Sequence, residues 1–235
     1  MTNKWLKVAL MAAAIATGTS IKIDAETVLY VPQDDRPVSL QYTVDTAREA
    51  GMTILTPPQN LISGKNYQGQ ADQIMAWVEQ NAGRADVMVL STDTLIYGGL
   101  VDSRKHNIPL TTLESRLKRI ESLKARNKNV RIYGFGTVMR SPRASGGGTE
   151  PAYYAEYGPT IFQIAALQDK LDSGSLTQEE TQKLMSLQAS VPVEYLQDWF
   201  DRRQKNMKIN KELIDETRSG VFDYFALGHD DTSQL

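Results

Sequence analysis

The chain has 235 residues, of which 41% are hydrophobic, so it is long and apolar enough to bury one sizeable core. Its 26 basic and 28 acidic side chains give a formal net charge of −2, which disfavours binding to nucleic acid or to an anionic membrane surface. The absence of cysteine from the sequence excludes disulfides, thiol nucleophiles and cysteine-ligated metals.

Residues 1–25 have the pattern of a secretory signal peptide. Lys4 and Lys7 form a positive N-terminal region, residues 8–16 form an apolar run rich in alanine, and cleavage is expected after Ala25. The apolar run is shorter than the roughly 20 residues that a membrane-spanning helix needs. We therefore expect an exported protein, periplasmic or extracellular, with no membrane association after signal removal. An uncleaved N-terminal anchor is the alternative.

The mature chain alternates predicted strands with predicted helices. Strands are expected where short apolar runs rich in β-formers occur, at Thr27–Pro32, 52–58, 85–91, 129–139 and 221–228. A helix is expected at 39–50, with Ser39 as its cap and Gly51 as its stop. Two further helices are predicted by apolar residues at helical spacing, namely Ile74, Trp77 and Val78, and then Leu110, Leu113, Leu117 and Ile120.

Residues 92–109 are expected to form a loop in which His106 is exposed to solvent. A helical insertion is expected at about residues 150–218, before the last strand. Within it, Thr177 and Glu180 have the spacing of a capping box, which predicts a helix start. On its last helix, Phe200, Met207 and Ile214 recur at seven-residue spacing and are expected to share one face.

Strands separated by helices predict an α/β fold with parallel strands and right-handed crossovers. We interpret residues 26–235 as the N-terminal portion of a catalytic-like domain with a (β/α) barrel-like fold, since only five of the eight strands of a barrel are present. The alternative is a doubly wound parallel sheet. Because an open half-barrel exposes unpaired strand edges, we expect such a portion to fold poorly or to aggregate by itself.

Polar side chains follow four of the predicted strands at their carboxyl ends, which is the functional edge in both architectures. The candidate site residues are Asp34, Asp35, Arg36, Asp93, Tyr97, Arg140, His229, Asp230 and Asp231. A plainer interpretation of Asp34, Asp35 and Arg36 is a turn stabilised by its own side chains, and Asp93 could simply cap a helix. Adjacent Asp230 and Asp231 repel one another, so they require a cation, a shared proton or a ligand.

Five segments in order resemble an uncharacterised bacterial family labelled domain of unknown function 4127. They are VPQDDRPVS, STDTLIYGGLVDSR, RIYGFGTVMRSP, YAEYG and FALGHDDTSQ, and together they cover nearly the whole mature chain. Members of this family are longer than this chain, which implies that the chain is an N-terminal portion. The family pattern often has glutamine at the position of His229, which implies that this histidine is not obligatory for catalysis.

Two close carboxylates at a barrel rim are typical of glycoside hydrolases. Adjacent aspartates fit substrate-assisted cleavage of N-acetylhexosaminides, in which Asp230 orients the acetamide group and Asp231 acts as general acid/base. This likeness to β-N-acetylhexosaminidases is an analogy. The remaining candidate residues would bind the substrate; they are Asp34, Asp35, Arg36, Asp93, Tyr97, Arg140 and His229.

Two alternatives stay open at this point. A divalent-metal-dependent hydrolase could use the hard oxygen ligands of the candidate aspartates, although the lack of HxH or HExxH spacing disfavours zinc. A non-catalytic carbohydrate-binding protein would also explain a polar rim. All three hypotheses predict a carbohydrate or another small polar ligand, and only the metal-dependent one requires a cofactor.

Overall fold

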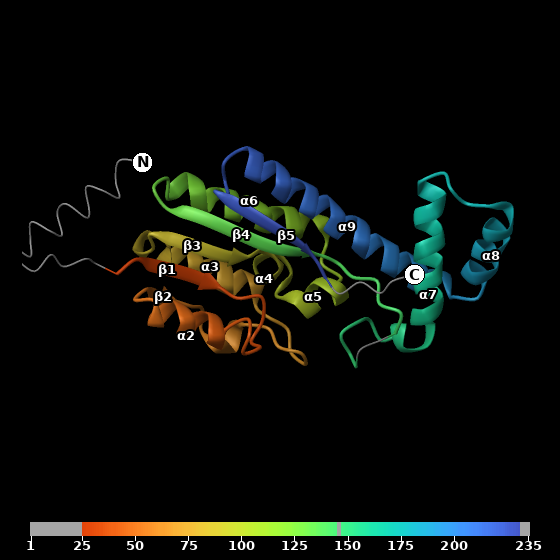
Figure 1. Ribbon diagram of the computed structural model, residues 1–235, viewed down its shortest axis with the longest axis horizontal. Helices are drawn as coiled ribbons and strands as arrows, with labels where there is room; N and C mark the ends of the chain where they lie inside the picture. The colour runs from red at the N-terminus through yellow and green to blue at the C-terminus, as the bar shows by residue number, and fades with distance from the viewer. Residues whose placement is uncertain (1–24, 145–146, 231–235) are drawn as a thin grey trace, which may run out of the picture.

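Five parallel strands form one sheet in the computed structural model, which describes residues 25–144 and 147–230 (Figure 1). The strands are β1 (Thr27–Val31), β2 (Thr53–Leu55), β3 (Val87–Ser91), β4 (Arg131–Val138) and β5 (Tyr224–His229). Their order across the sheet is β2-β1-β3-β4-β5, and each neighbouring pair is parallel. The predicted α/β class and the five predicted strands are confirmed.

The helices connect these strands in the expected alternation. They are α2 (Gln41–Glu49), α3 (Ala71–Asn81), α4 (Thr92–Tyr97), α5 (Leu100–Lys105), α6 (Leu110–Arg126), α7 (Tyr154–Asp172), α8 (Gln178–Ala189) and α9 (Val193–Arg218). Two short 3-10 turns, η1 (Gln59–Leu61) and η2 (Ala82–Arg84), flank α3. No helix within the described ranges is long and apolar enough to cross a membrane.

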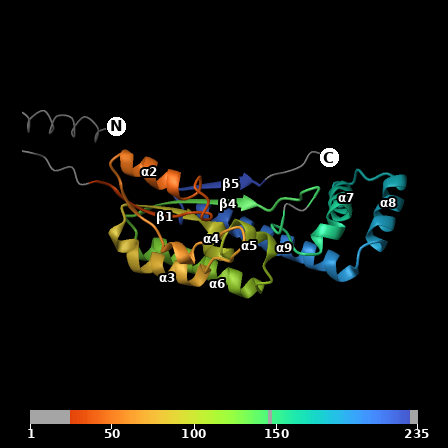
Figure 2. The ribbon, with the colours of Figure 1, turned by 90° about the horizontal axis from the view of Figure 1, so that it is seen from below.

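The main core lies between one face of the sheet and three helices. Side chains alternate between the two faces of a strand, so Leu29 and Val31 of β1 are fully buried against the helices, whereas Val28 and Tyr30 face the other side. Figure 2 shows α3, α6 and α9 on the first side of the sheet and α2 on the second. The apolar stripe predicted for α6 is confirmed, since Leu113, Leu117 and Ile120 are buried.

A second core holds the helical insertion together beyond the carboxyl ends of β4 and β5 (Figure 1). Tyr154 of α7 stacks on Trp199 of α9, with ring centroids 4.4 Å apart, and both side chains are fully buried. The capping box predicted at Thr177 and Glu180 is present at the start of α8. The insertion therefore has its own packing and contacts the sheet through α9.

One prediction about the helices is wrong. Residues 92–109 include α4 and α5 rather than one loop, and Ser91, not Asp93, caps α4 by accepting a hydrogen bond from the Thr94 N–H at 3.2 Å. The final helix predicted from Phe200, Met207 and Ile214 is present as α9, although Met207 and Ile214 are 49% and 38% exposed. The buried face of α9 includes polar side chains that form hydrogen bonds, so a search for apolar periodicity alone overlooks it. The residues of this buried face are Trp199, Arg202, Asn206, Ile209, Asn210 and Leu213.

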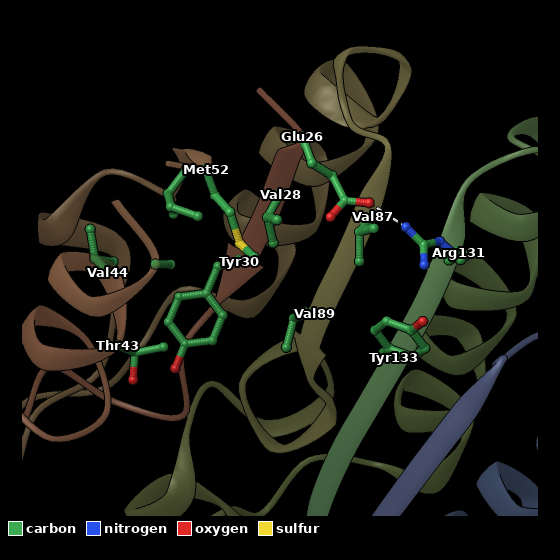
Figure 3. Close-up of a pocket in the computed structure, with 12 residues that line it drawn as sticks. Glu26, Val28, Tyr30, Thr43, Val44, Met52, Val87, Val89, Arg131 and Tyr133 are labelled. Carbon is green, nitrogen blue, oxygen red and sulfur yellow. Dashed lines mark hydrogen bonds and ion pairs between the residues drawn. The ribbon is translucent and has the colours of Figure 1, made fainter. Parts of the chain in front are cut away.

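The side of the sheet that carries α2 has an apolar groove of about 280 Å³ (Figure 3). Val28, Tyr30 and Val89 form part of its floor, and Val44 of α2 forms part of its wall. An ion pair between Glu26 and Arg131 lies at the end of the groove where the strands begin. The groove is therefore lined mainly by apolar side chains and does not include the polar residues that follow the strands.

Two glycines allow the loop before α3 to pass close to the turn between α4 and α5. Gly98 ends α4 in the left-handed region, with a φ of 111°. A Cβ atom added to Gly69 would lie 2.0 Å from the Gly98 carbonyl oxygen, a distance at which backbone must move. The position of the helices that follow β3 thus depends on this contact.

We predict that Gly69→Ala lowers the free energy of unfolding by about 1–3 kcal/mol, because the added methyl group overpacks a backbone contact. Chemical denaturation would measure the change. Gly83→Ala is the matched control, since nothing lies within 4 Å of its added Cβ. Equal stability of the two variants would contradict the role given to the contact between Gly69 and Gly98.

Candidate functional site

The carboxyl ends of three strands bring polar side chains together around Asp93. Asp93 lies in the first turn of α4, directly after β3, and is 2% exposed. Its Oδ2 atom accepts hydrogen bonds from Gln33 Nε2 at 3.0 Å and from Thr137 Oγ1 at 2.8 Å. Gln33 follows β1, and Thr137 belongs to β4. The sheet order changes direction between β1 and β3, and α/β sheets bind ligands at such a switch point.

The environment of Asp93 changes its acidity. Burial raises the pKa of Asp93 to about 6, because desolvation disfavours the charged carboxylate. The hydrogen bonds from Gln33 and Thr137 oppose this effect, and the negative charge of Asp230 adds to it. A carboxyl group with such a pKa can donate or accept a proton near neutral pH, as a general acid or base must.

Asp230 follows β5 and forms an ion pair with Arg104 of α5. Arg104 Nη2 lies 2.6 Å and Nε lies 2.9 Å from Asp230 Oδ2, and both side chains are largely buried. Arg104 is thus a cation that compensates this carboxylate. Asp231, the other predicted catalytic residue, lies outside the described residues.

Arg104 also approaches Glu150, which the sequence interpretation did not include. Arg104 Nη1 lies 3.8 Å from Glu150 Oε1, and Arg140 Nε donates to the same oxygen at 2.8 Å. The Glu150 side chain is fully buried, and burial raises its pKa. Arg104 and Glu150 were missed because neither residue directly follows a strand. Arg140 is the only one of these three that the strand-end pattern identified.

The candidate residues that follow β1 form a turn, as the plainer interpretation predicts. Asp34 Oδ1 accepts a hydrogen bond from the Arg36 N–H at 3.2 Å, and Arg36 Nη2 lies 2.8 Å from Asp34 Oδ2. Asp35 accepts a hydrogen bond from the Tyr67 hydroxyl group. The Asp34 contacts lie within the turn, whereas Asp35 is linked to Tyr67 of the loop before α3, and none of these hydrogen bonds reaches Asp93.

Tyr97 is buried and packs on His106. The two rings are stacked with centroids 4.9 Å apart, and the Tyr97 hydroxyl group has no hydrogen-bond partner in the part of the chain that the structure describes. Burial raises the pKa of Tyr97 well above its usual value, so the phenol stays protonated. His229, in contrast, is exposed at the end of β5.

The prediction that His106 is exposed to solvent is wrong, since this residue is 5% exposed. Asn206 donates to the Ser103 carbonyl oxygen, so its Oδ1 faces His106 Nε2 at 2.8 Å and accepts from it. His106 Nδ1 accepts from the Ile108 N–H at 3.2 Å. Burial lowers the pKa of His106 to about 4, so the ring is neutral at pH 7 and serves to connect α5 with α9.

A polar pocket of about 360 Å³ lies beside Tyr97 and His106, where the loop before α3 meets α5 and α6. Asp102 of α5 lines it and accepts a hydrogen bond from the Gly69 N–H at 3.0 Å. Within residues 25–144 and 147–230, no group of three His, Cys, Asp or Glu side chains could hold a metal ion.

We predict that two buried groups, Asp93 and His106, make the stability of the fold depend on pH in opposite directions. The pKa of Asp93 rises from 3.8 to about 6 on folding, so the folded state retains a proton that the unfolded state loses as pH rises through this range. Wild-type stability should therefore fall relative to Asp93→Asn by roughly 2 kcal/mol between pH 4 and pH 6. Chemical denaturation across this pH range measures the difference, and Asp45→Asn on the exposed side of α2 is the control.

His106 should have the reverse effect. Its pKa falls from 6.5 to about 4 on folding, so the unfolded state binds a proton first as pH decreases. The destabilisation caused by His106→Gln should be largest above pH 6.5 and should shrink by roughly 3 kcal/mol on going to pH 4. Denaturation curves at several pH values test this expectation. A pH-independent difference between variant and wild type would show that the ring is not kept neutral by burial.

No curated protein and no solved structure matches the chain. A family model described as "Protein of unknown function (DUF4127)" matches residues 28–235. The matched range contains Gln33, Asp93, Thr137 and Asp230, which are the residues at the strand ends. The resemblance noted in the five sequence segments is confirmed, and the chain belongs to this family of proteins of unknown function.

Proposed function

We propose that the residues at the strand ends form the active site of a hydrolase that cleaves a glycoside, with N-acetylhexosaminides as the first substrate class to test. The observation that carries this proposal is Asp93, a buried carboxyl group whose pKa is raised to about 6 beside the carboxylate of Asp230. Glycoside hydrolases use two carboxyl groups in different protonation states, one as a proton donor and one in its charged form.

The contacts of each carboxyl group support different roles. Arg104 holds Asp230 by two short contacts, which suits a charged group that orients a substrate acetamide or stabilises positive charge at the anomeric carbon. The sequence assigns the acid/base role to Asp231. Asp93 is a second candidate for proton transfer, because Gln33 and Thr137 fix its carboxyl group while burial keeps it protonated below about pH 6.

The choice between a (β/α) barrel and a doubly wound sheet is also part of the proposal. In a (β/α) barrel, successive strands are neighbours, whereas here β1 lies between β2 and β3. The order β2-β1-β3-β4-β5 is the one found in doubly wound sheets of the flavodoxin type, so it favours the doubly wound alternative. Both folds place their ligands at the carboxyl ends of the strands, so the location of the site is the same in each.

Export to the periplasm or the extracellular space is also proposed, on the strength of residues 1–25, most of which lie outside the described ranges. A carbohydrate ligand is proposed on the strength of the polar strand ends. The proposed mechanism uses side chains of the chain and needs no cofactor, whereas the metal-dependent alternative would.

We predict that the chain hydrolyses at least one member of a nitrophenyl glycoside panel that includes N-acetylhexosaminides and neutral hexosides. Asp93→Asn should lower kcat by about a hundredfold or more and remove a pH-dependent step near pH 6, because a general acid or base typically contributes this much. Asp230→Asn and Asp231→Asn should also lower kcat, and Asp45→Asn should not. Initial rates from pH 4 to pH 8 measure these effects.

Three results would redirect the assignment. Absence of turnover across the whole panel would refute the glycosidase proposal. Binding of a sugar without turnover would support the non-catalytic alternative. Activity that is lost on treatment with EDTA and restored by a divalent cation would support the metal-dependent alternative.

A further inference from the structure

A line of charged side chains leads from the strand ends to the helical insertion. Asp230 pairs with Arg104, Arg104 approaches Glu150, and Glu150 accepts a hydrogen bond from Arg140. The backbone carbonyl oxygen of Arg140 then accepts a hydrogen bond from Arg203 Nη2 of α9 at 2.6 Å. Arg203 therefore lies at one end of this line, and the proposed active site lies at the other.

Arg203 differs from its neighbour Arg202 in its partners. Arg202 donates to both carboxylate oxygens of Asp198, at 2.9 and 2.6 Å, and also to the His106 carbonyl oxygen and the Asn107 side chain. Within the described part of the chain, Arg203 donates only to two backbone carbonyl oxygens, those of Arg140 and Trp199, although a guanidinium group has five N–H donors. No carboxylate among the described residues forms an ion pair with Arg203.

Arg203 is nevertheless held in a partly buried position. Its guanidinium carbon lies 3.2 Å from the centroid of the fully buried Trp199 ring. Burial lowers the pKa of Arg203 to about 9, so the group is still charged at neutral pH. Burying a charge without an opposite charge is costly, and a side chain that served only packing would not need the charge.

Glu150 acts on the Arg203 guanidinium group electrostatically but forms no ion pair with it. Three guanidinium groups, those of Arg104, Arg140 and Arg203, act on Glu150 electrostatically and lower its pKa. Burial acts more strongly and raises the pKa of Glu150, which weakens it as a counter-ion.

We propose that Arg203 binds the anionic group of an acidic sugar, a carboxylate or a phosphate ester, while the sugar ring extends toward the strand ends. A guanidinium group matches both anions with paired hydrogen bonds, and stacking on Trp199 fixes its plane. The substrate class follows from the proposed hydrolase function, whereas the binding of the anion does not depend on it.

Direct binding tests the inference without any need for turnover. Isothermal titration calorimetry of the full chain with sodium glucuronate, glucose 6-phosphate and glucose compares a carboxylate, a phosphate and a neutral sugar. We expect at least one acidic sugar to bind about tenfold or more tightly than glucose, which corresponds to one charge-assisted hydrogen bond. The better acidic ligand identifies the anion.

Variants of neighbouring arginines make the test specific. Arg203→Met retains a side chain that can pack on Trp199 and should abolish the preference for the acidic sugar, whereas Arg203→Lys should retain part of it. Arg218→Met is the control, because Arg218 is 77% exposed and pairs with Asp215 on the surface. Thermal unfolding distinguishes an effect on binding from an effect on folding. Arg203→Met should not lower Tm. Arg202→Met should lower Tm, because it leaves Asp198 without its main partner.

Equal affinity for glucose and both acidic sugars, no measurable binding of either acidic sugar, or an unchanged preference in Arg203→Met would overturn the inference. Hydrolysis of neutral glycosides with no preference for acidic ones would also overturn it, and would leave the proposed function standing. Binding of an acidic sugar without hydrolysis would support the anion site and count against the proposed function.

Discussion

The hydroxyl group of Thr94 ties the ends of two strands together, and the arrangement of the site depends on it. Thr94 is fully buried, and its Oγ1 donates to the Pro32 carbonyl oxygen at 2.7 Å. This contact holds the end of β1 against the start of α4 after β3. Gln33, the next residue, can therefore reach Asp93. Because a buried hydroxyl group without a partner is costly, the contact opposes any separation of β1 and β3 at this edge.

Close backbone contacts complete the arrangement on the side of β4. A Cβ atom at Gly136 would lie 2.3 Å from Thr92 Oγ1, which donates to the Phe135 carbonyl oxygen at 3.1 Å. Glycine at this position lets α4 approach β4, so that Thr137 reaches Asp93. The raised pKa of Asp93 is thus a consequence of packing, because the same contacts that fix the carboxyl group also exclude water from it.

The sequence predicts a strand or helix where the buried residues of that element follow a simple apolar pattern. The strands and α6 have such a pattern and were predicted, as was the capping box at Thr177. Every residue of α4 is buried, so this helix has no polar face and no periodic signal. The buried face of α9 includes Arg202, which an apolar search reads as exposed. Asp93 was identified from its position after β3, but its acidity depends on burial, which only the tertiary structure reveals.

Several charged side chains at the carboxyl edge of the sheet, and beside it, are largely removed from solvent, which is unusual for charged groups. Arg202 and Asp198 show that the fold can pair a buried charge fully. Asp93 is instead buried with neutral partners, and Arg203 is partly buried against an aromatic ring without forming an ion pair with a described carboxylate. Each arrangement lowers stability, and natural proteins tolerate such losses mainly where function requires them. Since α/β sheets bind ligands at this edge, the two departures support the location of the site independently of the reaction proposed for it.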